Sequence, residues 1–247
     1  MSSSPAAPRA VVFDLDGTLV NSMPMVLRAF AHALAPFREP LSERELFLRL
    51  GGPPDRTFRE LIGDDRHVPA ALERMAAYSD ANWHLIQPFA GAQDLLGDLH
   101  QAGLGQAVWT GRDRFSTERI LAEHRFDARF REVVCGDDLP THKPHPQGLA
   151  EIMRRLGVVA AETIYVGDAD VDVLAGAELG VRTILIHHER SIEPHIAAKA
   201  WRVVATPPEA YRAVQAALAR QDCWIHAMRR ANRIATTSFA LPKGAGW

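Results

Sequence analysis

The segment AVVFDLDGTLV, residues 10–20, joins an apolar run to two aspartates and a Gly-Thr step. Its β-branched and aromatic residues predict a short buried strand over residues 10–13. Asp14 and Asp16 follow that strand two positions apart, so on an extended chain their carboxylates share one face. Like charges are costly to bury together unless a cation or hydrogen bonds offset them, and Mg²⁺ favours oxygen ligands. Taken alone, the segment predicts either a metal site at a strand end or a solvated acidic turn.

Three later segments have the same pattern, in which a predicted strand is followed by a polar loop. They are VWTGR at 108–112, THKP at 141–144 and VGDADVD at 166–172. Ligands of open parallel sheets bind outside the carboxyl ends of the strands. We therefore expect the four loops to meet at one edge of a sheet.

The region between residues 21 and 87 has a helical period, and no strand is predicted inside it. Four short helices are expected: Ser22 precedes the first, Ser42 and Glu45 form a capping box for the second, Gly63 ends the third, and Pro69 opens the fourth. Four helices without an intervening strand predict a small all-helical bundle, which we interpret as a cap.

After Pro88, helices and strands alternate. The predicted helices are 91–100, 115–123, 146–156, 170–179 and 208–220, and the predicted strands are 105–110, 132–135, 163–167, 183–187 and 202–205. This alternation predicts an α/β, Rossmann-like three-layer core with a mostly parallel sheet. The expected domains are a core of residues 1–20 and 88–220, a cap of residues 21–87, and a mobile or loosely docked C-terminal extension of residues 221–247.

Bulk composition excludes several classes of protein. A length of 247 residues allows one domain with an insertion, and 47% hydrophobic with 23% charged residues is ordinary for a soluble globular protein. A net charge of −2 argues against nucleic acid as a partner, and no apolar stretch reaches the length of a membrane span. Cys135 and Cys223 form no zinc or disulfide pattern. A cytoplasmic protein is expected.

With its four motifs in order, the sequence resembles the haloacid dehalogenase-like hydrolase superfamily over residues 10–215. The resemblance is to the phosphatase branch with a helical cap inserted after the first strand, which includes phosphoglycolate phosphatases and β-phosphoglucomutases. It implies Mg²⁺-dependent hydrolysis of a small phosphorylated metabolite through an aspartyl phosphate.

The resemblance also implies roles for individual residues. Asp14 corresponds to the nucleophile, and Asp16 to the general acid that then serves as the base. Asp16 favours phosphate chemistry, because dehalogenating relatives lack a second aspartate. Thr110 corresponds to the hydroxyl that binds a phosphoryl oxygen, and Lys143 to the cation that neutralises charge there.

The metal ligands implied by the resemblance are Asp14, Asp16 and Asp168, with Asp172 in support and Mg²⁺ as the ion. Beyond these, the sequence suggests substrate contacts from Gly111 and Arg112 in the core and from Gly52 and Arg56 in the cap. Two positions depart from the family pattern: Ala169 stands where serine is frequent, and Asn21 where many relatives have aspartate. His142, His145, His187 and His188 lack a strong metal-ligand spacing and are expected near an anionic substrate instead.

Two alternatives remain at this stage. A sugar phosphomutase of the same branch would use the same four motifs, and a catalytically quiet partner-binding protein could use the same fold. The intact set of aspartates argues against the second alternative. The sequence specifies neither the metabolite nor an oligomeric state.

Overall fold

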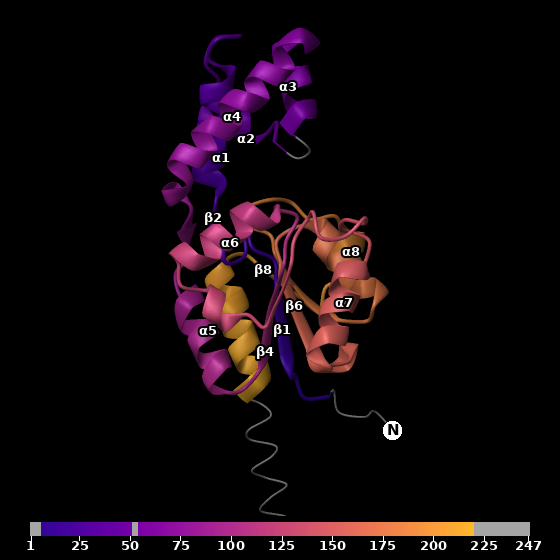
Figure 1. Ribbon diagram of the computed structural model, residues 1–247. Coiled ribbons are helices and arrows are strands. Elements are labelled where there is room, and N and C mark those ends of the chain that lie inside the picture. The colour runs from indigo at the N-terminus through magenta and orange to yellow at the C-terminus, as the bar shows by residue number, and fades with distance from the viewer. Residues whose placement is uncertain (1–5, 51–53, 220–247) are drawn as a thin grey trace, which may run out of the picture.

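The core is a six-stranded sheet in the order β5-β4-β1-β6-β7-β8 (Figure 1). The computed structural model describes residues 6–50 and 54–219. The strands are β1 (Ala10–Phe13), β4 (Gly105–Trp109), β5 (Glu132–Val134), β6 (Thr163–Gly167), β7 (Arg182–Ile186) and β8 (Arg202–Val204). Every neighbouring pair in this sheet is parallel, which confirms the predicted α/β fold.

Helices cover both faces of the sheet (Figure 1). One face carries α5 (Ala92–Gln101), α6 (Arg114–Glu123) and a helix at 207–219, and the other carries α7 (Gln147–Leu156) and α8 (Asp170–Glu178), with α9 (Pro194–Ala197) beside α8. Both faces need covering because successive side chains of a strand point to opposite faces. In β1, Val11 and Phe13 pack against the α5 side of the sheet and Val12 against the α7 side. The predicted core elements agree with these bounds to within one residue.

The segment between β1 and the core helices forms four helices, as predicted. They are α1 (Met23–Leu34), α2 (Glu43–Phe47), α3 (Pro54–Ile62) and α4 (Val68–Asn82), and we refer to residues 23–82 as the helical insertion. The insertion has its own apolar cluster, in which the rings of Phe30 and Phe58 lie 4.9 Å apart. The capping box of Ser42 and Glu45 is present, whereas the Ser22 side chain makes no capping hydrogen bond.

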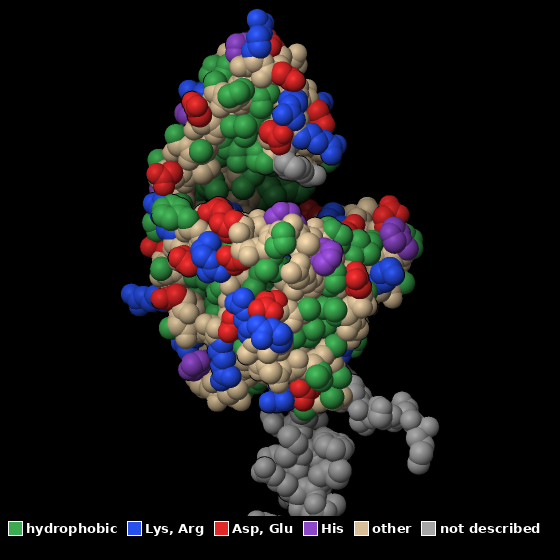
Figure 2. All heavy atoms as spheres, turned by 45° about the vertical axis from the view of Figure 1, so that its right-hand side comes forward, with side chains coloured by type: hydrophobic (Ala, Val, Ile, Leu, Met, Phe, Trp, Pro, Cys, Tyr) green, Lys and Arg blue, Asp and Glu red, His purple; other side chains and the backbone are tan. Residues whose placement is uncertain are grey.

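A two-stranded antiparallel ribbon joins the insertion to the core. It pairs β2 (Val20–Asn21) with β3 (Gln87–Pro88), so the two connections run side by side. The insertion lies above the carboxyl ends of the core strands (Figure 1), and a deep notch with hydrophobic side chains on the insertion's side separates the two parts (Figure 2). The edge predicted to hold the site therefore lies beneath the insertion.

Four single-turn 3₁₀ helices complete the described elements. They are η1 (Asp65–His67), η2 (Trp83–Leu85), η3 (Asp127–Arg129) and η4 (Ala160–Glu162). Within residues 6–50 and 54–219, the helices are too short or too polar to cross a membrane. Gly51, Gly52 and the predicted extension of residues 221–247 lie outside the described residues.

Candidate active site

Four loops that are distant in the sequence meet at the carboxyl edge of the sheet. They surround a cavity of about 540 Å³. Its walls include five of the residues predicted to act in catalysis, substrate binding or metal support: Asp14, Thr110, Gly111, Lys143 and Asp172. This convergence follows from parallel topology, because β1, β4, β5 and β6 all end at the same edge.

Lys143 is the charged centre of this cavity. Its Nζ lies 2.7 Å from Asp14 Oδ1 and 2.8 Å from Asp172 Oδ1. The ammonium also lies 4.9 Å from the ring centre of Trp109 and 5.5 Å from that of Tyr165. Burial works to lower the pKa of Lys143, but the two carboxylates outweigh it and raise the pKa above its usual value. Lys143 is therefore held as a cation against Asp14.

Asp172 has the contacts of a supporting residue. Its Oδ1 accepts hydrogen bonds from the Tyr165 hydroxyl (2.5 Å) and from Lys143, and its Oδ2 accepts one from the Ala169 N–H (3.0 Å). Three donors thus fix the carboxylate in place. The role of Tyr165 was not predicted from the sequence, because in the strand TIYVG it resembles one more apolar core residue. A tyrosine hydroxyl next to an acidic loop needs a hydrogen-bond partner when buried, and this need could have indicated the contact.

An acidic group suited to bind a cation is formed by Asp14, Asp168 and Asp172. Their ligand oxygens all lie within 4.8 Å of one another. Burial raises the pKa of Asp14 to about 7, with Lys143 opposing and Asp172 and Asp16 adding to the rise. Burial and the neighbouring carboxylates of Asp14 and Asp172 likewise raise the pKa of Asp168 well above its usual value.

The local charges fit one divalent ion. Four carboxylates (Asp14, Asp16, Asp168, Asp172) face two cations (Lys143, Arg112), which leaves two negative charges when all are ionised. The Asp168 carboxylate lies 3.8 Å from His188 Nε2, beyond hydrogen-bonding distance. An all-oxygen ligand set with this charge suits Mg²⁺ or a similar hard cation.

Asp16 was predicted to be a metal ligand, but the structure places its carboxylate against Arg112 rather than with the other aspartates. Arg112 donates to it through both arms of the guanidinium, Nε to Oδ2 at 2.9 Å and Nη2 to Oδ1 at 2.6 Å. Burial works to raise the pKa of Asp16, but Arg112 and the Ser22 hydroxyl lower it below its usual value. The Asp16 carboxylate thus stands outside the acidic group, and Arg112, predicted to grip substrate, binds a carboxylate of the protein. The guanidinium fork matches a carboxylate closely, and neighbouring strands bring the two together.

Arg112 also has a backbone contact at the cavity. Its N–H donates to Thr110 Oγ1 at 3.1 Å, so the threonine hydroxyl and the chain at Gly111 are held as one turn. Thr110 is buried, and Gly111 has open space where a side chain would stand. A ligand can approach the backbone of this turn closely.

Of the remaining predicted residues, His142 lies at the cavity, Arg56 lies in the helical insertion and Gly52 lies outside the described residues. Arg56 is an exposed residue of α3 that bonds to Glu60 at 3.0 Å. Of the four histidines, His142 lines the cavity and His188 bonds to the Gly17 carbonyl at 2.8 Å. Among the described residues, the acidic group alone has potential ligands close enough for a metal, and no histidine belongs to it.

Comparison with known proteins gives a consistent result. The chain matches the family model for haloacid dehalogenase-like hydrolases over residues 11–186. It is 32% identical over 186 residues to the phosphoglycolate phosphatase of Pseudomonas fluorescens (strain Pf0-1), covering 72% of this chain and 68% of that protein. It is 31% identical over 174 residues to the pyrophosphatase PpaX of Anoxybacillus flavithermus, covering 70% and 80% respectively. A crystal structure of a predicted phosphoglycolate phosphatase from Haemophilus somnus matches the fold with a TM-score of 0.74 at 22% identity, over 84% of this chain and 98% of that one.

Proposed function

The chain belongs to the haloacid dehalogenase-like hydrolase family, and on that premise we propose that it is a Mg²⁺-dependent phosphatase of a small phosphorylated metabolite. The observation that carries the proposal is the contact of Lys143 with Asp14 inside a cavity bordered by Thr110 and Gly111. A carboxylate paired with a buried cation, beside a turn whose backbone is open to a ligand, is suited to accept a phosphoryl group. The two relatives named above are called after phosphoglycolate and pyrophosphate, which are small anions.

Asp14 is the nucleophile in this mechanism. Its carboxylate attacks phosphorus, the ester oxygen leaves, and an aspartyl phosphate results. Lys143 lies 2.7 Å from the attacking carboxylate and neutralises charge that gathers on the phosphoryl oxygens. The Thr110 hydroxyl and the Gly111 backbone, which line the same cavity, bind the same oxygens.

Asp16 handles the protons. It donates one to the leaving oxygen and later accepts one from the water that splits the aspartyl phosphate. The ion pair with Arg112 favours the ionised carboxylate, which suits the second step. We propose that a substrate anion draws Arg112 away from Asp16, so that the carboxyl group can hold the proton needed for the first step.

Asp14 and Asp168 would hold the metal, beside the Asp172 carboxylate that Tyr165 and Ala169 fix in place. The Asp16 carboxylate, which the sequence predicted as a further ligand, is paired with Arg112 instead. When bound, Mg²⁺ supplies positive charge that offsets the acidic group and the phosphoryl oxygens.

Gly17 leaves space for the Asp168 carboxylate, and a methyl group at this position is expected to impair catalysis. Gly17 has φ +73°, and an added Cβ would lie 2.1 Å from Asp168 Oδ2. Gly17→Ala is therefore expected to displace Asp168 and lower kcat by at least about tenfold, because a 1 Å misplacement can cost about 10²-fold. Gly103→Ala is the control, since Gly103 has φ +74° and no neighbour within 4 Å. It has the same backbone strain, and equal losses of kcat in the two variants would contradict the proposed role of Gly17.

The helical insertion is proposed to act as a cap that selects the substrate. Arg56→Ala is expected to lower kcat/KM for the best natural substrate about tenfold, since a hydrogen bond to a charged group contributes about 1.5–3 kcal/mol. Activity on a small aryl phosphate should change by less than about twofold. The matched control is Arg59→Ala, because Arg59 lies on the same helix and pairs with Asp55 at 2.8 Å. Equal losses of kcat/KM on both substrates, or no loss on either, would show that Arg56 does not contribute to substrate selection.

The function itself is tested by release of inorganic phosphate from a panel of phosphorylated metabolites, with and without Mg²⁺. Mg²⁺-dependent release from one or a few compounds is expected. Conversion of one sugar phosphate into its isomer without phosphate release would instead identify a phosphomutase. No turnover of any compound, including an aryl phosphate, would favour a partner-binding protein.

A further inference from the structure

The loop that carries Lys143 has little regular structure of its own. It runs from Cys135 to Pro146 between β5 and α7, and β5 is a three-residue strand at the edge of the sheet. Inside the loop, the Asp138 N–H donates to the Cys135 carbonyl at 3.2 Å and the His145 N–H to the His142 carbonyl at 2.9 Å. Contacts from other elements must therefore hold the loop in place.

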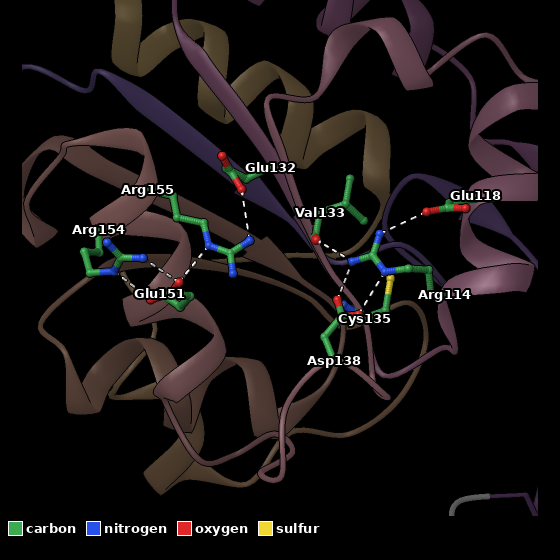
Figure 3. Close-up of polar contacts among 9 residues, drawn as sticks. All are labelled: Arg114, Glu118, Glu132, Val133, Cys135, Asp138, Glu151, Arg154 and Arg155. Atoms are coloured by element: carbon green, nitrogen blue, oxygen red, sulfur yellow. Dashed lines mark hydrogen bonds and ion pairs between the residues drawn. The ribbon is translucent and has the colours of Figure 1, made fainter.

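Arg114, the first residue of α6, supplies such contacts (Figure 3). Its Nε donates to Asp138 Oδ1 at 2.8 Å, and its Nη2 donates to Asp138 Oδ2 and, at 2.9 Å, to the Val133 carbonyl. The Asp138 carboxylate in turn accepts the Cys135 N–H at 2.7 Å. We call Arg114, Asp138 and the Val133 carbonyl the Arg114 clamp. One side chain thus reaches the end of β5 and the start of the loop.

The geometry of the clamp sets it apart from ordinary surface ion pairs, which contribute little. The side chains of Arg114 and Asp138 are only 39% and 24% exposed, the pair is bidentate, and both partners also bind backbone groups. The Arg114 guanidinium beside Asp138 lowers the pKa of that carboxyl, while burial opposes the change. The clamp therefore holds its geometry as a network rather than as a single contact.

The same loop also packs directly against the turn after β4. The Gly136 N–H donates to the Arg112 carbonyl at 2.8 Å, and a Cβ on Gly136 would lie 2.3 Å from the Gly111 carbonyl oxygen. The two backbones are in contact, so a shift of one loop moves the other. Arg114 joins them, because it follows the β4 turn and grips the β5 loop.

We propose that Arg114 is a positioning residue, whose clamp on Asp138 and Val133 sets where Lys143 and the turn at Thr110–Gly111 stand relative to Asp14. This inference rests on the proposed phosphatase function. Arg114 itself makes no contact with the reacting groups; it acts through the two loops.

The test compares Arg114→Lys, which keeps the charge but loses the fork, with Asp138→Asn. Each is expected to lower kcat for an aryl phosphate by about 10–100-fold while KM changes by less than about threefold, because misplaced groups weaken the transition state more than substrate binding. The double variant should lose no more than about twofold beyond the worse single variant, since both changes break one unit.

Arg155→Ala is the matched control. Arg155 is 43% exposed and pairs with Glu132 at 3.3 Å and Glu151 at 2.7 Å, close to the other end of β5 (Figure 3). It touches neither loop, so its kcat should stay within about twofold of wild type. Equal falls in kcat for Arg155→Ala and Arg114→Lys would show general destabilisation and overturn the inference.

Hydrogen exchange of residues 135–143, read by mass spectrometry, separates this inference from the proposed function. Exchange should rise in Arg114→Lys and Asp138→Asn but not in Arg155→Ala, whether or not the protein is a phosphatase. An active wild type with unchanged kcat in both clamp variants would overturn the positioning role and leave the function intact. An inactive wild type would overturn the function, and unchanged loop exchange would then overturn the clamp as well.

Discussion

Asp14→Asn is expected to abolish turnover while the fold is retained. The amide keeps the shape of the side chain but is no longer a nucleophile, so kcat should fall by more than about 10⁴-fold, beyond the loss of a general acid or base. Lys143 keeps its contact with Asp172, so the buried cation is not left without a partner. Steady-state kinetics with an aryl phosphate and a thermal melt measure the two effects.

The control for this variant is Asp170→Asn. Asp170 lies at the same edge of the sheet but pairs with Arg190 at 2.7 Å. Its replacement should leave kcat within about threefold of wild type, since it touches none of the reacting groups. Turnover by Asp14→Asn above about a hundredth of wild type would refute the nucleophile assignment.

The second large effect is expected from the metal. Treatment with a chelator should remove activity, and Mg²⁺ should restore it in the wild type but not in Asp168→Ala. The loss in Asp168→Ala at saturating Mg²⁺ should exceed about a hundredfold, the upper range for residues that only support a metal site. Calorimetric titration with Mg²⁺ alone gives a readout independent of activity and should show binding to the wild type only.

Stability in chelator separates a lost ligand from a damaged fold. Asp168 lies close to Asp14 and Asp172. Burial raises the pKa of Asp168 most, and repulsion from these two carboxylates raises it further. Removing one carboxylate should therefore raise the melting temperature of the metal-free protein. Full activity of the wild type in chelator, or recovery of Asp168→Ala with Mg²⁺, would contradict the proposed metal site.

The sequence was sufficient to predict most of the fold. Strands β1 and β6 have strongly apolar, β-branched compositions and end in acidic loops, so both their existence and their ends could be read directly. The ribbon of β2 and β3 could not be predicted, because two-residue strands have no period. The helices of the insertion were predicted from capping residues and apolar spacing.

The candidate site was predictable as a set of loops but not as a network of contacts. Parallel topology brings Asp14, Thr110 and Lys143 to one edge, whatever their rotamers. The pairing of Arg112 with Asp16 depends on side-chain direction and on register between β1 and β4, which the sequence does not specify. The hydroxyl of Tyr165 lay hidden in an apolar strand for the same reason: its role exists only once Asp172 is beside it.

The account depends most on a covalent phosphoryl group at Asp14, and Asp16→Asn gives the means to trap it. The asparagine still offers Arg112 an acceptor, but it no longer activates water against the aspartyl phosphate. An aryl phosphate has a good leaving group and needs little help from a general acid, so the first step should proceed. The measurement is acid quench of this variant with an aryl phosphate and Mg²⁺, followed by peptide mass spectrometry. We expect one phosphoryl group per protein on the peptide that contains Asp14. A phosphoryl group on another side chain, or continued release of the aryl alcohol with no labelled peptide, would contradict the mechanism.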